Sequence, residues 1–321
     1  GNLNELDNYS VFVIPTGGFY GLSSLPSFKT KLEEYVNNGG TLIVLTQQHG
    51  YEFDTAPGDL SGYGWLEDQS CLYASIGISK YHVILSGQDS VILDANVDGY
   101  FTKYPENATI LLSRTKNGMP AMVMYKYGNG TVIASTIYED WAYTSYQATQ
   151  DGKNLIRDMI AWAKCPQDIL DYGVGDAITI PINVTNDANV TGHNVSFEVR
   201  DPDKKTIGYV NVSVEIASNE TKTINFIYTA PSKLGIWWTN YSLYGDNLIQ
   251  ATREVERFAV SKYASNPNGW VYKGKEITYA VSSDSENYAY GSNGTFTITI
   301  WNQGDVAKNV TCWWSFPHNY W

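Results

Sequence analysis

The residues best suited to chemistry are polar side chains that follow strand-like apolar runs. His49 comes soon after the run Thr41–Leu45, and Glu52 and Asp54 follow it closely. A histidine beside a carboxylate can hold a metal ion or transfer a proton, here at the edge of a sheet. The alternative is a loop histidine that bonds to the backbone. None of the four histidines has metal-ligand spacing with another: His49, His82, His193 and His318.

A second candidate is a pair of adjacent acids. Glu139 and Asp140 follow the apolar run Thr131–Ser135, which places them at the same predicted edge as His49. Two carboxylates at one edge can share acid and base roles. The alternative is a solvated loop.

A third candidate is a calcium loop. Asp94, Asn96, Asp98 and Gly99 match the first half of the pattern D-x-[DN]-x-[DN]-G. The twelfth position, which should hold glutamate, is Pro105. Weak calcium binding by Asp94, Asn96 and Asp98 is therefore one expectation, and an ordinary turn is the other; we expect no other cofactor.

Sequons for N-glycosylation are dense. Asn-x-Ser/Thr occurs 11 times, nearly three times as often as the composition would produce. We expect these asparagines to carry glycans on an extracellular surface, although a β-rich chain with many Asn and Thr residues also generates sequons. They are Asn8, Asn107, Asn129, Asn183, Asn189, Asn194, Asn211, Asn219, Asn240, Asn293 and Asn309.

Three cysteines leave the disulfide connectivity open. In an oxidising compartment, Cys71 and Cys165 could join within the first domain, and Cys312 could pair outside this chain segment. Three buried thiols are the alternative.

The elements that position these residues begin with a helix and a strand. Ser24 as cap and Pro26 in the first turn predict a helix that ends at Asn38–Gly40. The apolar run Thr41–Leu45 predicts a strand covered on both faces. Because the run Val11–Pro15 precedes the helix, the order strand, helix, strand is typical of a parallel sheet.

Further runs complete this half. We predict strands at Tyr81–Leu85 and Thr109–Leu112, and a hairpin whose strands are Ala121–Tyr125 and Thr131–Ser135. A last helix is predicted at about 149–163, and Cys165-Pro166 ends the domain.

This half resembles a known group, the flavodoxin-like domains related to class I glutamine amidotransferases, including the ThuA-like and β-galactosidase trimerisation types. The resemblance is carried by Asn8–Pro15, Tyr35–Leu45 and Tyr127–Ile133. It implies a strand and a helix before Asn8, so we expect the natural protein to extend upstream of Gly1.

The resemblance also permits a test for amidotransferase activity. Such an enzyme needs a cysteine on a strand-to-helix elbow and a histidine with an acid to activate it. Gln47 or Gln48 stands at the elbow position, and the segment Thr136–Trp141 holds no histidine. We therefore expect no amidotransferase activity.

After Pro166, apolar residues alternate with polar ones in short runs, which predicts an antiparallel β-sandwich. Tyr172-Gly173 and His193–Ser196 have counterparts at Tyr290-Gly291 and Lys308–Thr311, offset by about 115 residues. Both units resemble CARDB-type immunoglobulin-like modules of prokaryotic surface proteins.

The predicted fold is thus an α/β flavodoxin-like domain with a parallel sheet, followed by tandem antiparallel β-sandwiches of immunoglobulin-like type. The predicted domains are 1–166, 167–262 and 263–321, the last being the start of a second sandwich. We expect the protein to continue beyond both ends of this segment.

Composition restricts the partners. A formal net charge of −12 and no basic cluster argue against nucleic acid. No apolar run reaches the length of a membrane span. Trp237-Trp238 and Trp313-Trp314 could form a sugar platform, but neighbours in a strand face opposite ways, so one of each pair is expected in a core.

We therefore expect a non-catalytic extracellular or cell-surface glycoprotein that self-associates through its sandwich domains as part of a surface layer (S-layer), filament or stalk. Dense sequons point, by analogy, to an archaeal surface. The alternative is a carbohydrate-binding or hydrolytic module on the cell surface that acts near His49 and Glu139.

Overall fold

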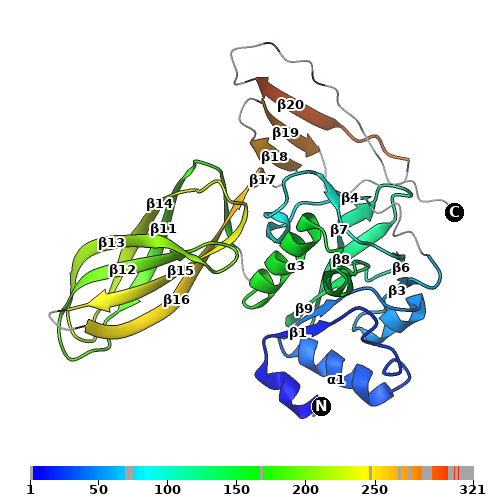
Figure 1. Cartoon of the computed structure of the whole chain (residues 1–321), viewed down its shortest axis with the longest axis horizontal. Helices are drawn as coiled ribbons and strands as arrows, with labels where there is room; N and C mark the ends of the chain where they lie inside the picture. The colour runs from blue at the N-terminus through cyan, green and yellow to red at the C-terminus, as the bar shows by residue number, and fades with distance from the viewer. Residues whose placement is uncertain are drawn as a thin grey trace. The chain divides into compact units, whose positions relative to one another are not determined.

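The computed structural model divides the chain into two compact units (Figure 1). One comprises Gly1–His82, Gln88–Gln167 and Val310–Trp321, and the other Val83–Gly87 and Asp168–Asn309. The structure describes residues 3–68, 75–166, 169–245, 248–266, 269–273, 277–283, 291–302, 307 and 310. The predicted further division at residue 262 remains a prediction.

The first unit is built on a seven-stranded mixed sheet with the order β1-β2-β9-β8-β7-β4-β5. Only β1, β2 and β9 run parallel to one another, and the other neighbours pair antiparallel. The strands are β1 (Val11–Ile14), β2 (Thr41–Val44), β4 (Ser75–Ile78), β5 (Ile92–Asp94), β7 (Thr109–Arg114), β8 (Pro120–Tyr127) and β9 (Gly130–Ser135).

Three α-helices and a small second sheet accompany this sheet in the described residues. The helices are α1 (Pro26–Asn37), α2 (Glu139–Thr144) and α3 (Gln150–Ala163). The second sheet pairs β3 (Ser61–Tyr63) with β6 (Tyr100–Lys103). Short 3-10 helices are η1 (Leu3–Asn8), η2 (Gly50–Thr55) and η4 (Val83–Leu85), the last counted with the second unit.

In the part of the second unit that the structure describes there are three sheets. A five-stranded sheet has the order β10-β16-β15-β12-β13, and a two-stranded sheet pairs β11 with β14. Their bounds are β10 (Leu170–Gly173), β11 (Ala177–Thr185), β12 (Gly192–Arg200), β13 (Thr206–Ile216), β14 (Thr221–Thr229), β15 (Gly235–Tyr244) and β16 (Leu248–Ser261). These two sheets share one core, which includes Ile180, Phe197, Phe226 and Trp237. The third sheet contains β17 (Tyr263–Asn266), β18 (Gly269–Lys273), β19 (Ile277–Ser283) and β20 (Phe296–Asn302).

The predicted fold class, a flavodoxin-like α/β domain plus tandem antiparallel immunoglobulin-like sandwiches, is wrong. The structure is mainly β, and both larger sheets are mixed. Hairpins and loops, rather than crossover helices, connect the antiparallel strands β7, β8 and β9. In the second unit β10 runs parallel to β16, and β17–β20 form a single antiparallel meander.

Local predictions in the first unit fared better. Helix α1 buries Phe28, Leu32, Tyr35 and Val36, and β2 is buried along its whole length, as the sequence predicted. The serine cap is wrong, because Leu25 occupies the cap position and the Ser24 hydroxyl bonds instead to the Gly21 carbonyl. The strand predicted at Tyr81–Leu85 is also wrong, since this segment contains the 3-10 helix η4.

Close backbone contacts at glycines join three segments of the first unit. A Cβ on Gly50 would lie 1.7 Å from the Gly62 carbonyl oxygen, and a Cβ on Gly64 would lie 2.3 Å from that of Gln47. A Cβ on Gly99 would lie 2.0 Å from the carbonyl oxygen of Tyr63. Only residues without a Cβ permit this approach, which brings η2 and β3 to the end of β2.

Gly50→Ala should therefore destabilise the first unit by roughly 2–4 kcal/mol, because the new methyl group displaces the backbone of Gly62. Gly77→Ala in β4 is the matched control, since its Cβ would make only ordinary contacts. Urea unfolding of both variants measures the difference. Equal stabilities would show that the close approach at Gly50 relaxes without consequence.

Candidate functional site

The position predicted for a nucleophile is occupied by a buried structural amide. Gln47 has no exposed surface. Its Oε1 accepts a hydrogen bond from the backbone N–H of Phe19 at 2.8 Å, and its Nε2 donates to the carbonyl oxygens of Leu45 at 2.8 Å and Pro15 at 3.2 Å. Gln47 thus ties the loop after β1 to the end of β2, and its amide has no nucleophilic character.

The predicted pair Glu139 and Asp140 begins helix α2, and the two carboxylates bind different loops. Glu139 is buried and accepts hydrogen bonds from the backbone N–H groups of Asn96 at 2.7 Å and Thr149 at 3.1 Å. Asp140 accepts from the backbone and the hydroxyl of Thr16, at 2.9 and 2.6 Å. Each carboxylate therefore anchors a loop, and the two are not joined as an acid–base pair.

His49 pairs with a carboxylate that the sequence did not indicate. Its Nδ1 lies 2.7 Å from Oε1 of Glu67. The other oxygen of Glu67 accepts hydrogen bonds from the backbone N–H groups of Gly64 at 2.8 Å and Gly50 at 3.1 Å. Glu52 instead accepts from the backbone N–H of His49, and Asp54 pairs with Lys29. Glu67 lies 18 residues from His49, so no local spacing could have revealed the pair.

These contacts determine the charge of Glu67. Its partial burial acts to raise the pKa of the carboxyl group. Hydrogen bonds from His49, Gly64 and Gly50 outweigh that effect and hold the pKa of Glu67 below its ordinary value. The carboxylate is thus ionised near neutral pH, and it orients the imidazole ring of His49.

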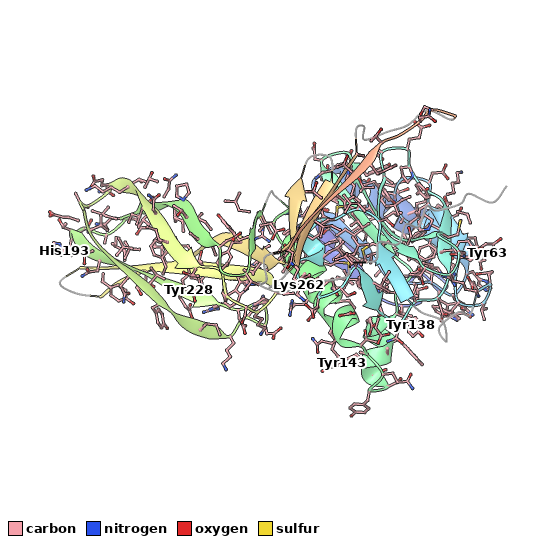
Figure 2. All side chains as sticks on the ribbon, turned by 90° about the horizontal axis from the view of Figure 1, so that it is seen from above. Tyr63, Tyr138, Tyr143, His193, Tyr228 and Lys262 are labelled. Atoms are coloured by element: carbon pink, nitrogen blue, oxygen red, sulfur yellow. The ribbon has the colours of Figure 1, made fainter. Side chains whose placement is uncertain are left out.

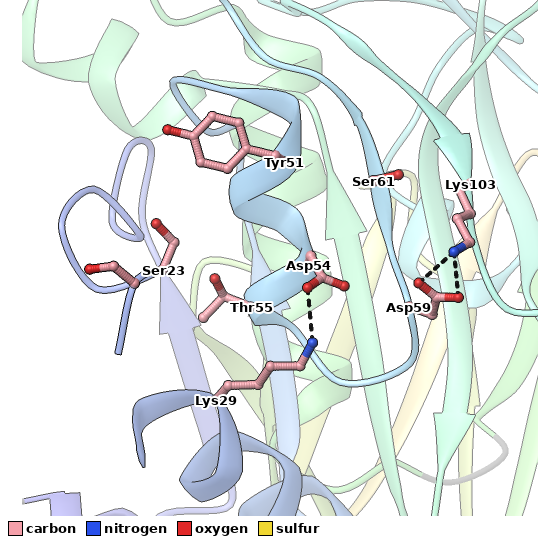
Figure 3. Close-up of a pocket in the computed structure, with 9 residues that line it drawn as sticks. Ser23, Lys29, Tyr51, Asp54, Thr55, Asp59, Ser61 and Lys103 are labelled. Atoms are coloured by element: carbon pink, nitrogen blue, oxygen red, sulfur yellow. Dashed lines mark hydrogen bonds and ion pairs between the residues drawn. The ribbon is translucent and has the colours of Figure 1, made fainter. Parts of the chain in front are cut away.

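A polar pocket lies beside this pair. Its volume is about 550 Å³, and Tyr51 is the one aromatic residue in its lining (Figure 3). Lys29 pairs with Asp54 at 3.1 Å, and Lys103 pairs with Asp59 at 2.7 Å. The lining comprises Ser23, Ser24, Lys29, Tyr51, Asp54, Thr55, Asp59, Ser61 and Lys103. The Tyr51 ring stacks on the His49 ring, with centroids 5.1 Å apart and 17° between the planes.

The predicted calcium residues take part in other interactions. Asn96 Nδ2 donates to Glu139 Oε1 and to the Gln147 carbonyl oxygen, both at 3.1 Å. The backbone of Asp94 is bonded by Asp151 and Thr149, and the backbone N–H of Asp98 donates to Thr136. Among the described residues, no group of three or more His, Cys, Asp or Glu side chains could hold a metal ion. Calcium binding here stays a prediction.

The remaining candidate residues are dispersed. His82 packs edge-on against Trp162, with ring centroids 5.0 Å apart, while His193 is exposed at the tip of the second unit (Figure 2). Trp237 and Trp238 are both buried, so they form no sugar platform. Cys165 is exposed just after α3. Outside the described residues lie Cys71, Cys312, His318, Trp313 and Trp314.

The sequon asparagines are exposed with one exception. Nine of the ten that the structure describes are exposed: Asn8, Asn107, Asn129, Asn183, Asn189, Asn194, Asn211, Asn219 and Asn293. Asn240, in the internal strand β15, is only 8% exposed, and its Nδ2 donates to Glu198 at 3.3 Å. The eleventh, Asn309, lies outside the described residues. A folded chain thus presents nine of these side chains to solvent and encloses Asn240.

Comparison with known proteins gives partial likenesses. No family model matches the chain. An uncharacterised protein of Clostridium acetobutylicum is 30% identical over 146 residues, which are 44% of this chain and 15% of that protein. The chain therefore spans a small part of this relative.

Comparison with solved structures finds weak partial matches to glycosidases and to a CARDB domain. A β-galactosidase from Bacillus circulans sp. alkalophilus matches 69% of this chain and 33% of its own, with 15% identity and a TM-score of 0.33. The CARDB domain of a Pyrococcus furiosus protein matches 30% of this chain and 81% of its own, with 16% identity and a TM-score of 0.22. These overlaps are too weak to define a fold or an activity, and they do not confirm the flavodoxin-like domain.

The Glu67 contacts predict a pH-dependent contribution to stability. Because folding lowers the pKa of Glu67, its contribution is present above the ordinary value of 4.5 and is lost as the pH falls through the folded pKa. Glu67→Gln should lower the free energy of unfolding by about 1 kcal/mol at pH 7, through weaker hydrogen bonds. The difference from the unsubstituted chain should shrink as the pH falls below the ordinary pKa of 4.5 and through the folded pKa.

Urea unfolding between pH 3 and pH 7 measures this dependence. Glu106→Gln, a change at an exposed glutamate, is the control and should leave stability nearly unchanged. A Glu67→Gln effect of the same size at every pH would contradict the assigned cause.

Proposed function

We propose that this chain belongs to a non-catalytic, extracellular or cell-surface glycoprotein with a structural role in a surface layer, filament or stalk. The observation that carries the proposal is the exposure of nine sequon asparagines on a chain enriched in sequons. A glycan needs its asparagine at the surface, and dense glycosylation belongs to extracellular surfaces.

The sheet edge supports the non-catalytic part. A catalytic acid, base or nucleophile needs a polar atom available to a substrate. The polar side-chain atoms of Gln47, Glu139 and Asp140 instead form hydrogen bonds with neighbouring backbone and side-chain groups. The alternative is a carbohydrate-binding or hydrolytic module that acts near His49 and Glu139. Its hydrolytic form is disfavoured because each of these residues is held by different partners.

The second unit presents surfaces suited to assembly. Its outer strands differ in how they are protected against pairing with another chain. Strand β11 contains Pro181 and the sequon residue Asn183, and edge strand β13 contains the sequon residue Asn211. Strand β14 has neither proline nor a sequon asparagine, and its one charged side chain is that of Lys222, near the start of the strand. Self-association of the chain through β14 is therefore part of the proposal.

The other partner classes follow from charge and hydropathy. A net charge of −12 disfavours nucleic acid, whose phosphates repel an acidic surface. Within the residues that the structure describes, no helix is long and apolar enough to cross a membrane.

The first test is the glycan map. Glycopeptide mass spectrometry of the protein from its native host should find glycans at most of the nine exposed sequons and none at Asn240. The buried, hydrogen-bonded amide of Asn240 leaves no room for a sugar in the folded chain. An unmodified mass would refute the proposal that the chain is glycosylated. Full glycan occupancy at Asn240 would refute the claim that burial prevents glycosylation there.

The second test concerns assembly. Ile227 on β14 is 62% exposed, and a charge there should block edge pairing. Ile227→Lys should weaken self-association by about tenfold in sedimentation velocity, a change of about 1.4 kcal/mol. Ile207→Lys on the sequon-bearing strand β13, where Ile207 is 49% exposed, is the matched control and should have little effect.

Particles that stay monomeric at high concentration would refute the assembly role. Equal effects of the two substitutions would refute the assignment of the contact to β14.

A further inference from the structure

An exposed aromatic ring at the wall of the polar pocket stacks on a neighbouring imidazole ring. Tyr51 is 65% exposed, yet one neighbour restricts it, because its ring stacks on His49. His49 is in turn held by Glu67, which accepts hydrogen bonds from the backbone at Gly50 and Gly64. A ring oriented in advance loses little conformational freedom when it binds a ligand.

The rest of the wall offers hydrogen-bonding groups without net charge. Two ammonium groups and two carboxylates form the pairs Lys29–Asp54 and Lys103–Asp59, so their formal charges cancel (Figure 3). Four residues with hydroxyl side chains also line the pocket, Ser23, Ser24, Thr55 and Ser61. Exposed ion pairs contribute little to stability, so these groups can exchange their contacts for those of a ligand.

Asp59, another residue of the pocket wall, has an unusual backbone conformation. Its backbone has a φ of 61°, in the left-handed region that non-glycine residues adopt uncommonly, although Asp does so more often than most. This conformation accompanies the 2.7 Å ion pair between Asp59 and Lys103.

These features select among ligand classes. A phosphorylated ligand would need an excess of positive charge, which the pocket lacks. An apolar ligand would leave the charged and hydroxyl-bearing side chains of the lining without hydrogen-bonding partners. A sugar ring has an apolar C–H face for an aromatic side chain and hydroxyl groups around its rim. The volume of about 550 Å³ suits a small ligand of one or two rings.

We infer that the pocket at Tyr51 binds a short neutral saccharide, with Tyr51 as the stacking platform and Asp54, Asp59, Lys29 and Lys103 as hydrogen-bonding partners of its hydroxyls. This binding activity is separate from the structural role. The saccharide has two sources, a free or cell-wall sugar, or the glycan of a neighbouring copy; the second rests on the proposed function.

Binding is tested on the full chain produced without glycans. Saturation-transfer NMR uses methyl glycosides of glucose, galactose, mannose and N-acetylglucosamine, with cellobiose and lactose, each at up to about 10 mM, which detects affinities near the millimolar range. At least one of these sugars should bind. Tyr51→Ala should weaken that binding by about tenfold or more, and Tyr51→Phe should retain it.

Tyr20→Ala is the matched control, because Tyr20 is 72% exposed and does not line the pocket. It should bind as the unsubstituted chain does. Asp59→Asn should weaken binding several-fold while thermal unfolding stays nearly unchanged. The inference is overturned if no sugar in the panel binds, or if Tyr51→Ala and Tyr20→Ala bind equally well.

The source of the saccharide is distinguished on glycosylated protein. If the sugar that binds also dissociates self-associated particles, the ligand is a neighbour's glycan; if particles persist while the sugar binds, it is a free saccharide. Both outcomes support the pocket. Because the first measurement uses unglycosylated chain, failure of binding and failure of the glycoprotein assembly are separate results.

Discussion

The candidate site depends on the close approach of backbone segments at glycine. Gly50, Gly64 and Gly99 each lie so near a carbonyl oxygen that a Cβ would clash. The contact places η2 against β3 and brings the backbone N–H groups of Gly50 and Gly64 to one carboxylate, that of Glu67. Glu67 then orients His49, and His49 supports the ring of Tyr51. A side chain at any of these glycines would displace the backbone and, with it, the contacts that link Glu67, His49 and Tyr51.

The same unit shows how an edge rich in polar residues can be structural. Buried polar groups are stable when their hydrogen bonds are complete, and a completed group has little left for a substrate. Gln47 bonds to three backbone groups, and Glu139 accepts from two loops. Catalysis requires the opposite condition, a polar group held in place but left partly available. The pair of His49 and Glu67 is partly exposed, and it supports an aromatic ring.

The sequence predicted local structure well and long-range pairing poorly. The period of α1, the apolar run of β2 and the hairpin of β8 and β9 depend on neighbours along the chain, and these elements were predicted correctly. The place of β4 in the sheet depends on β7, a partner far along the chain, and the hairpin of β7 and β8 was not recognised, so the parallel sheet was predicted wrongly. For a similar reason, Glu67 was not identified from the sequence. Its contact with His49 arises only because Gly50 and Gly64 let their backbone segments approach each other closely. The sequon at Asn240 looks like the others, and only its place in an internal strand distinguishes it.

The distribution of sequons on the second unit limits where such a protein could contact others. The turns 186–191 and 217–220 lie together, since Ser218 donates to the Ala188 carbonyl at 2.6 Å and the Asn219 N–H to that of Asn186 at 2.7 Å. Asn189 and Asn219 lie in these turns, and Asn194 lies diagonally across from Asn211. Glycans at these positions would cover one end of the unit and the β13 edge. Protein contacts would then fall on the edge of β14 that faces away from β11, because that strand itself holds no sequon asparagine and a bulky, hydrated glycan keeps another chain from approaching closely.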